Sequence, residues 1–307
     1  MLDYRLMRDF DKLAPVAALL DDPGGVMALI VGVEGPSYRS PGAMMALLSD
    51  GRTVGRLSSG CIEADLAIHA GRARLSGRPV SLRYGLGSPF ADITLPCGGG
   101  LDILLVPAPE RDALETLMLV DVARCAVTLA IGPDDRISAS LGAEPAASGF
   151  RSFTYLPEPQ FRIFGDGDET AAFSALVHAV GYDQITHSGD PVTLDVIARS
   201  GCRGVELTRQ VPFMADVDPY TAVLFFFHDH DRELPLILAA MDTPAFYIGA
   251  QGSRRTHSNR VMALAREGAT ADGIARVHGP IGLIHSARDP RVLAVSVLAE
   301  VLDRRRR

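Results

Sequence analysis

A strand, a Gly-x-Gly turn, a helix and a second strand follow one another in the second half of the chain, and this order limits the fold more than any other feature. The first strand is predicted at 161–164 (FRIF), the turn is Gly165-Asp166-Gly167, and the helix covers AAFSALVHAVG. A short strand is predicted next, at 183–186. This order describes the first βαβ unit of a doubly wound parallel sheet of the Rossmann type.

The turn itself is a poor place for a pyrophosphate. Asp166, Asp168 and Glu169 put carboxylates around it. Each like-charge pair about 6 Å apart costs roughly 2 to 3 kcal/mol at an effective dielectric constant of about 20. Ser188 stands where a dinucleotide site has the acid that binds ribose. The two glycines of the turn are the candidate cofactor contacts, but ordinary NAD(P) binding is not expected.

Four polar residues follow the apolar strand predicted at 222–227 (AVLFFF). His228, Asp229, His230 and Asp231 come at the carboxyl end of this strand, where open α/β sheets bind ligands. Their side chains are metal ligands by type, but alternate residues of an extended chain give only two ligands on one side. Binding by His228 and Asp229 without a metal is therefore favoured, and Asp231 is an alternative cap for the next helix.

A further polar turn follows the strand predicted at 246–249 (FYIG). It contains Gly252, Ser253, Arg254 and Arg255. Glycine backbone, a hydroxyl group and guanidinium groups suit a phosphate, so Gly252, Ser253 and Arg254 are candidate binding residues. The alternative interpretation is an ordinary turn with solvated arginines.

The first half contains a Gly, Ser and Arg-rich run from Glu34 to Glu63. A continuous apolar strand, predicted at 26–33, precedes it and suits burial on both faces. Apolar runs at 43–48 and 52–57 flank an Asp-Gly pair, which is the usual sign of a tight hairpin. The chemistry of the protein is expected in this run.

Ser58, Ser59, Gly60 and Cys61 lead from the hairpin into a helical pattern, CIEADLAIHAGRARL. A loop that enters a helix N-terminus presents free N–H groups that suit an anion such as phosphate. A cysteine at this position is expected to be a reactive thiolate. The alternative is that Ser59 caps the helix and Cys61 is a small buried residue.

A second glycine cluster, PCGGG at 96–100, precedes the apolar strand LDILLVP. Three consecutive glycines usually mark a place where the backbone passes close to something, either a ligand or another strand. Cys97 makes the ligand interpretation of Gly98 and Gly99 more attractive. Whether Cys61 and Cys97 meet in space stays open.

Composition limits the class of protein. The 307 residues are 47% hydrophobic, enough for two domains, and a Gly, Pro, Ala and Ser-rich stretch places their boundary between residues 1–150 and 151–307. Four cysteines and no apolar leader or span predict a cytoplasmic protein with reduced thiols. A net charge of −7 argues against nucleic-acid binding. Lys12 is the only lysine, which excludes a Walker P-loop.

The motifs occur in an order that resembles a known family. The series EGPSYRSPGAMM, DGRTVGRLSSGCIEA, PCGGGLDILL, the Gly-x-Gly strand, HDHD, YIGAQGSRR, GPIGL and AVSVLAE spans about Ala28 to Glu300. It resembles the xanthine dehydrogenase accessory protein family of the XdhC/CoxI type. The ordered series is far more specific than any single motif.

The resemblance implies a fold, a function and a site. The fold is an N-terminal α/β domain carrying the loops that read SSGC and CGGG here, joined to a C-terminal Rossmann-like doubly wound parallel sheet. The function is a maturation chaperone that binds molybdenum cofactor transiently, supports its sulfuration by a partner cysteine desulfurase and delivers it to an apo molybdenum hydroxylase such as xanthine dehydrogenase. The family is commonly dimeric, so a homodimer is expected. The implied cofactor-handling residues are Arg39, Ser58, Gly60, Cys61, Cys97, Gly98 and Gly99.

A soft thiolate suits a molybdenum centre, so Cys61 or Cys97 is a candidate transient molybdenum ligand. Departures from the family pattern gather in the second half: Asp168, Glu169 and Thr170 after the turn, Ser188, and Ile284-His285 after GPIGL. Ser59 replaces one of two glycines in the first loop.

Two other functions stay open. One is an NAD(P)-dependent oxidoreductase that uses Gly165 and Gly167, and the other is a docking scaffold without a small ligand. No acid/base pair or triad is evident in the sequence, so no catalytic residue is assigned. No membrane association is expected.

Overall fold

The structure is a computed structural model that describes residues 12–60, 62–89, 95, 98–144, 147–208 and 214–305, with only the backbone at positions 230 and 231. The chain divides into two compact units, Met1–Pro157 and Glu158–Arg307. The boundary lies after the strand β8, Arg151–Tyr155, which pairs with the strand β6, Val127–Ile131, of the first unit. The sequence boundary after residue 150 assigns this strand to the second domain instead.

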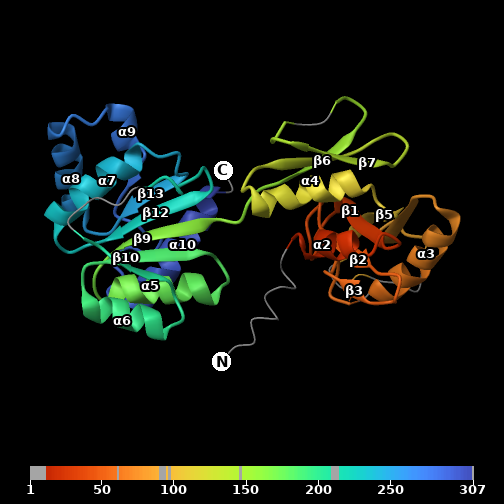
Figure 1. The fold of residues 1–307 in the computed structure, drawn as a ribbon, viewed down its shortest axis with the longest axis horizontal. Helices are drawn as coiled ribbons and strands as arrows, with labels where there is room; N and C mark the ends of the chain where they lie inside the picture. Colours follow the sequence, from red (N-terminus) through yellow and green to blue (C-terminus); the bar gives the residue numbers. More distant parts are fainter. Residues whose placement is uncertain are drawn as a thin grey trace. The chain divides into compact units, whose positions relative to one another are not determined.

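The first unit is built on a five-stranded antiparallel sheet in the order β3-β2-β1-β5-β4 (Figure 1). The apolar run predicted as a strand forms the central strand β1, and the two runs around Asp-Gly form the hairpin β2–β3, as predicted. The strands are β1 Val26–Glu34, β2 Met44–Leu47, β3 Thr53–Val54, β4 Val80–Gly85 and β5 Gly100–Pro107.

Both faces of this sheet are covered, which explains the continuous apolar sequence of β1. Alternate β1 residues, such as Ala28 and Ile30, pack with Leu66 and Ala70 of the helix α3 (Glu63–Ser76) on one face. On the other face, the intervening residues share a core with two helices and a three-stranded antiparallel sheet, β7-β6-β8. These elements are α2 Ala14–Asp21, α4 Arg111–Val122, β6 Val127–Ile131 and β7 Ile137–Leu141.

The second unit contains a six-stranded parallel sheet in the order β11-β10-β9-β12-β13-β14. The chain builds outward from β9 to β11 and then returns to the other side of β9 at β12, so β9 and β12 meet at the switch point of a doubly wound sheet. The predicted Rossmann-like fold is therefore confirmed. The strands are β9 Gln160–Gly165, β10 Gln184–Ser188, β11 Gly204–Glu206, β12 Thr221–Phe226, β13 Tyr247–Ala250 and β14 Val277–His278.

Helices cover both faces of the parallel sheet. Phe161 and Ile163 of β9 share a core with α5 and α10 on one face, where α6 also packs beside α5. Phe164 of β9 and Phe225 of β12 share the opposite core with α7 and α8. The helices are α5 Asp168–Ala179, α6 Pro191–Arg199, α7 His230–Met241, α8 Arg254–Arg266, α9 Ala271–Ala275 and α10 Pro290–Arg305.

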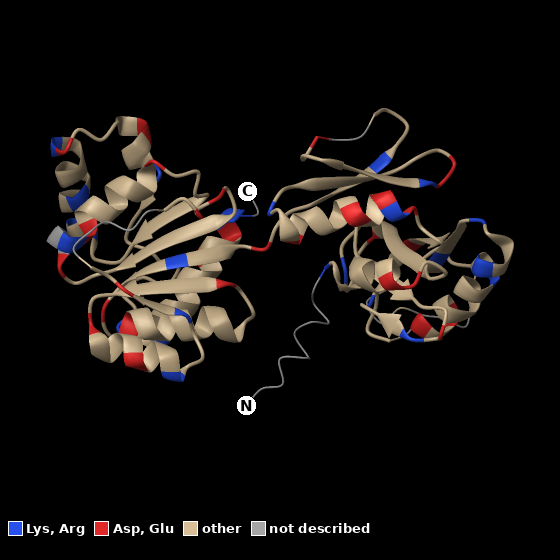
Figure 2. Ribbon diagram, viewed as in Figure 1, with Lys and Arg blue, Asp and Glu red and all other residues tan. Residues whose placement is uncertain are grey.

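Charged residues of both signs are interspersed over the described parts of both units (Figure 2). None of the helices in the described segments combines the length and the apolar character that crossing a bilayer requires.

Candidate functional site

The loop in front of α3 is closed by a carboxylate. Glu63, in the first turn of α3, accepts hydrogen bonds from the backbone N–H of Ser58 at 3.0 Å, the Ser58 hydroxyl at 2.7 Å and the N–H of Ile62 at 3.2 Å. The N–H of Gly60 donates to Ser58 Oγ at 3.1 Å. Ser58 is only 2% exposed, whereas Ser59 and Gly60 are exposed. We call this set, Ser58, Gly60, Ile62 and Glu63, the Glu63 clamp.

The Glu63 clamp changes the interpretation of the loop. The expectation that its N–H groups are free for an external anion is wrong for Ser58, Gly60 and Ile62, because Glu63 and Ser58 Oγ already accept from them. Burial raises the pKa of Glu63, but the hydrogen bonds from Ser58 and the backbone outweigh it and hold the pKa below its usual value. The N-cap residue of α3 is Ile62, so Ser59 is not the cap. Cys61 lies outside the described residues.

The glycines before β5 are explained by the chain's own backbone. A Cβ at Gly99 would lie 2.0 Å from the carbonyl oxygen of Pro36 and 2.9 Å from that of Glu34. A Cβ at Gly85 would lie 2.2 Å from the carbonyl oxygen of Gly99. The sequence leaves open whether these glycines pass close to a ligand or to another strand. At Gly99 the close neighbour is another segment of the chain, at residues 34 and 36. Gly98 is exposed, and nothing lies within 4 Å of where its Cβ would be. Cys97 lies outside the described residues.

The segments that flank the two cysteine positions share one core. Ile62, next to Cys61, and Leu95, two positions before Cys97, belong to the same cluster of buried side chains, together with Tyr84 of β4. The Tyr84 hydroxyl also donates to Asp65 of α3 at 2.6 Å. The structure therefore joins α3 to the β4–β5 edge by both apolar packing and a hydrogen bond.

Arg83 and Arg39 of the first unit differ in their ion pairs. Arg83 of β4 forms ion pairs with Glu34 and, at 2.9 Å, with Asp102, so its charge is balanced. Arg39 is half-buried, and no ion pair of its guanidinium is found with the described residues. Arg39 is therefore the better of the two for an external anion.

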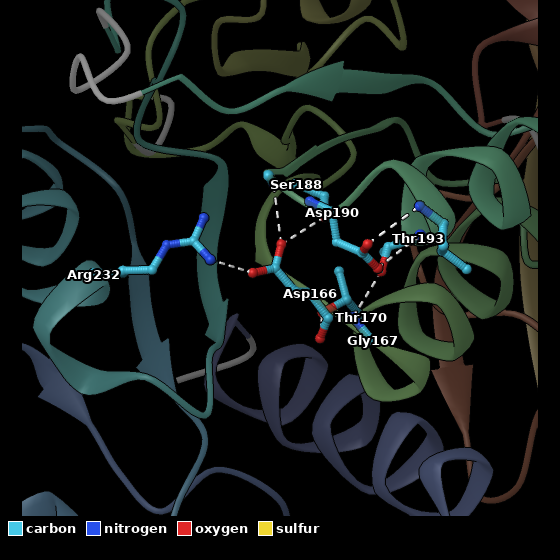
Figure 3. Close-up of polar contacts among 9 residues, drawn as sticks. Asp166, Gly167, Thr170, Ser188, Asp190, Thr193 and Arg232 are labelled. Carbon is cyan, nitrogen blue, oxygen red and sulfur yellow. Dashed lines mark hydrogen bonds and ion pairs between the residues drawn. The ribbon is translucent and has the colours of Figure 1, made fainter.

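In the second unit, the polar groups of the turn after β9 are hydrogen-bonded or ion-paired to other residues of the protein (Figure 3). Asp166 Oδ1 accepts from the Ser188 hydroxyl at 2.7 Å and from the Gly189 N–H at 3.0 Å. Asp166 Oδ2 forms an ion pair with Arg232 Nη1 at 2.6 Å. This carboxylate therefore bridges the ends of β9 and β10 and the helix α7.

The two glycines of the turn have separate roles. A Cβ at Gly165 would lie 2.6 Å from the Phe226 carbonyl oxygen and 2.6 Å from Thr170 Oγ1, so only glycine fits between β9 and β12. The N–H of Gly167 donates to Thr193 Oγ1 at 2.8 Å, and Thr193 Oγ1 donates to Asp190, the N-cap of α6, at 2.5 Å. The Gly167 donor that would reach a pyrophosphate is thus already used.

The polar residues after β12 lie at the carboxyl edge of the sheet, as predicted. His228 is exposed, with its Nε2 atom 3.6 Å from Glu169 Oε2. The helix α7 begins at His230, so Asp231 lies inside its first turn and the prediction that it caps the helix is wrong. Among the residues that the structure describes, no cluster of three or more His, Cys, Asp or Glu side chains could hold a metal ion.

The turn after β13 fits the alternative interpretation of its sequence, an ordinary turn with solvated arginines. Ser253 is the N-cap of α8, and its hydroxyl accepts from the Thr256 N–H at 3.1 Å. Arg254 and Arg255 are exposed. The structure therefore gives Ser253 a structural role, and a binding role for Gly252 and Arg254 stays a prediction.

Three charged residues that form buried or bridging contacts carry little or no signal in the sequence. Glu63 lies five positions after Ser58, which is outside the i, i+3 spacing of a capping box. Arg232 lies 66 positions from Asp166 and carries no local signal. Glu233 forms an ion pair with Arg260 at 2.8 Å, with both side chains almost fully buried. The one available signal for that pair was a charged residue at an inward position of each amphipathic helix.

Comparisons with known proteins agree with this architecture. Residues 21–85 match the model of the XdhC and CoxI family, and residues 161–301 match that of the XdhC Rossmann domain. The crystal structure of a xanthine dehydrogenase from Bacillus halodurans superposes with a TM-score of 0.69, covering 97% of this chain and 96% of that one. At 23% identity this likeness shows the fold alone.

Two relatives align along nearly the whole chain. The molybdenum cofactor insertion chaperone PaoD of Escherichia coli (strain K12) is 33% identical over 290 residues, which cover 93% of this chain and 85% of that protein. A probable xanthine dehydrogenase subunit of Bacillus subtilis (strain 168) is 24% identical, with 95% and 96% covered. With both domains matched in order and a relative of 33% identity along the chain, the protein belongs to the XdhC and CoxI family.

Proposed function

We propose that this protein is a molybdenum cofactor chaperone, which binds the cofactor, supports its sulfuration and delivers it to a molybdenum hydroxylase such as xanthine dehydrogenase. The observation that carries this proposal is the 33% identity, along 93% of the chain, to a protein named as a molybdenum cofactor insertion chaperone. The proposal makes the protein a maturation factor with no catalytic residue of its own.

The first unit supplies the groups that fit such a cargo. Gly60 and Gly98 are exposed, with open space beside each α-carbon, so a ligand can approach both loops closely. Arg39 offers a guanidinium for the terminal phosphate. In the proposal, Cys61 or Cys97 contacts the molybdenum end through a soft thiolate, and the Glu63 clamp holds the residues on both sides of Cys61.

The proposed partners follow from the chemistry of the cargo. Sulfuration needs a sulfur donor, which we assign to a cysteine desulfurase, and delivery needs an apo molybdenum hydroxylase. We further propose that the protein acts in the cytoplasm as a homodimer. Cys125 and Cys202 are free thiols, which is consistent with a reducing compartment.

The test is cofactor retention by the purified protein. The full chain is mixed anaerobically with molybdenum cofactor released from a donor enzyme, re-isolated, and assayed for fluorescent pterin. We expect stoichiometric pterin, and loss of most of it in a Cys61→Ala, Cys97→Ala double variant. Cys125→Ala is the matched control, because this free thiol contacts the other core of the first unit.

A parallel NADH titration distinguishes the alternatives. Saturable NADH binding without bound pterin would indicate an oxidoreductase instead. Binding of neither ligand would favour a docking scaffold. Unchanged retention in the double variant would remove the cysteines from the proposed site.

A further inference from the structure

The helix α3 is apolar on its outer side as well as on its inner side. Three buried residues form its core side: Leu66, Ala70 and Ala73. Four other residues follow one another along the opposite side, at spacings of four, three and four positions: Ala64, Ile68, Gly71 and Leu75. Residues at these spacings form one line along a helix. We call these four residues the outer seam.

The outer seam is open to solvent. Leu75 is 91% exposed and Ile68 is 58% exposed. Ala64 is exposed too, and none of the described residues lies within 4 Å of where a Cβ of Gly71 would be. The outer side of a surface helix normally carries polar side chains. Apolar residues in one line at this spacing, in contrast to a single exposed side chain, indicate a surface that packs against another helix.

The order of sizes along the outer seam favours a second copy of α3 that runs antiparallel. The spacing of four, three and four positions is the same in both directions. About a twofold axis between Ile68 and Gly71, Ile68 meets the partner's Gly71 and Leu75 meets the partner's Ala64. Each large side chain then faces a small residue, glycine or alanine, so the two helices approach closely. In a parallel pair the two Gly71 residues would face each other and leave a gap.

The charges beside the outer seam complement each other in the same arrangement. Asp65 and Arg72 each follow a small seam residue, so they lie on the same flank of the seam. The twofold axis brings this flank against the same flank of the second copy, which places Asp65 beside the partner's Arg72. The contacts of Asp65 with Tyr84 and His69 both use Oδ2. Arg72 is exposed, and its guanidinium has no ion pair with the residues that the structure describes.

We propose that the outer seam of α3 is the interface of a symmetric homodimer, in which α3 of one copy packs antiparallel against α3 of the other. This inference assigns a surface to the homodimer of the proposed function and rests on that part of it. The antiparallel arrangement brings the C-terminal end of the partner's α3 next to the loop at 58–60, which precedes α3. The candidate cofactor loop therefore borders the interface.

The test is sedimentation equilibrium of the full chain over a range of protein concentrations. We expect a dimer, with twice the chain mass of 32.7 kDa. Ile68→Glu introduces two carboxylates into the interface, one from each copy, and should raise the dimer dissociation constant by at least about a hundredfold, because an unpaired charge loses its hydration there. Val122→Glu is the matched control, since Val122 is 78% exposed on α4 of the same unit. It should leave the dissociation constant unchanged.

A second variant tests the flanking charges. Arg72→Glu places a carboxylate beside the partner's Asp65 on each side of the axis. Because these pairs are partly exposed to solvent, we expect the dissociation constant to rise by only about three- to tenfold. The dissociation constant of the wild type should also rise with salt concentration.

Disulfide formation tests the antiparallel direction. In a background with the four native cysteines replaced by alanine, a chain carrying both Ala64→Cys and Leu75→Cys should form crosslinked dimers on oxidation. Each single variant should not, because the two copies of one residue then lie about 15 Å apart along the helices, beyond the reach of a disulfide. Efficient crosslinking of either single variant would overturn the antiparallel arrangement.

Two results of the sedimentation experiment would overturn the interface. One is a dimer that Ile68→Glu and Leu75→Glu leave intact, which would place the interface elsewhere. The other is a monomeric wild type. If the free energy of unfolding of that monomer also falls in Ile68→Glu, the outer seam is covered by another part of the same chain. Urea unfolding of each variant supplies this measurement and shows that the variants fold.

Cofactor retention separates this inference from the chaperone function. A wild type that retains pterin but is monomeric would overturn the interface and leave the chaperone function standing. A wild-type dimer that Ile68→Glu dissociates, but that retains no pterin, would support the interface while the chaperone function fails.

Discussion

At Glu63 one carboxylate accepts three hydrogen bonds from Ser58 and Ile62. Replacing it with alanine leaves these partly buried donors unpaired, and we expect Glu63→Ala to lower the free energy of unfolding by about 1 to 3 kcal/mol. Urea unfolding of the full chain measures this. Glu115→Ala removes a carboxylate from an exposed ion pair with Arg111 and is expected to change stability by less than about 0.5 kcal/mol. Equal effects of the two variants would contradict a structural role for the Glu63 clamp.

The same residue predicts a dependence on pH. The pKa of Glu63 in the folded protein lies below its ordinary value of 4.5, because hydrogen bonds stabilise the ionised form. The unfolded state therefore takes up a proton first, so this contribution is full above pH 4.5 and is lost as the pH falls through the lower, folded pKa. Glu63→Gln should lose less stability than the wild type over this acid range. Urea midpoints at neutral pH and at about pH 4 provide the comparison.

Two glycines of the first unit should respond to alanine with opposite sign. At Gly99 a Cβ would meet the Pro36 carbonyl oxygen at 2.0 Å, so Gly99→Ala is expected to cost at least about 3 kcal/mol. At Gly71, inside α3, nothing lies within 4 Å of the added Cβ, so Gly71→Ala should stabilise by about 0.5 to 1 kcal/mol. Thermal unfolding of both variants decides this, and a tolerated Gly99→Ala would show that the loop is not held against residue 36.

At the scale of elements, β9, β10 and α7 are joined through Asp166. Ser188 is buried and donates to Asp166 at 2.7 Å. Ser188→Asp, which restores the acid usual at the end of a second Rossmann strand, would place two carboxylates in contact, and we expect a loss of about 3 kcal/mol. An Asp166→Ser, Ser188→Asp double variant should recover much of this loss, because only one carboxylate remains. A double-mutant cycle in urea tests the coupling, and additive effects would contradict it.

The elements themselves were largely predictable from sequence, because β1, β9 and β12 are buried on both faces and so read as continuous apolar runs. What sequence could not provide depends on contacts between distant segments. Asp166 reads as a repulsive charge until Arg232, 66 positions later, is placed beside it. A boundary after residue 150 separates β8 from its partner β6, because the two strands pair across a Gly and Pro-rich stretch that carries no local sign of the contact. The sequence predicts an open Ser58–Gly60 loop, because it carries no sign that the loop folds back and brings Ser58 to Glu63.

At the scale of the whole molecule, each unit has its own buried clusters, and among the described residues none belongs both to a cluster of the first unit and to one of the second. Residues 158–307 expressed alone should therefore fold, with coincident cooperative unfolding by circular dichroism and fluorescence. A fragment starting at residue 151 should fold equally well, with the strand β8 unpaired. A non-cooperative transition in both fragments would show that the second unit depends on the first.

The glycine at position 165 has a consequence for how such chains diverge. Its missing Cβ is required by the Phe226 carbonyl oxygen and by Thr170 Oγ1, both parts of the protein itself. Selection therefore retains this glycine as long as β9 lies beside β12, whatever the turn binds. Asp166, one position later, is free to exchange an external ligand for Ser188 and Arg232 without altering the sheet. In this architecture a Gly-x-Gly turn therefore does not by itself indicate a bound dinucleotide, because the packing of β9 against β12 already requires its first glycine.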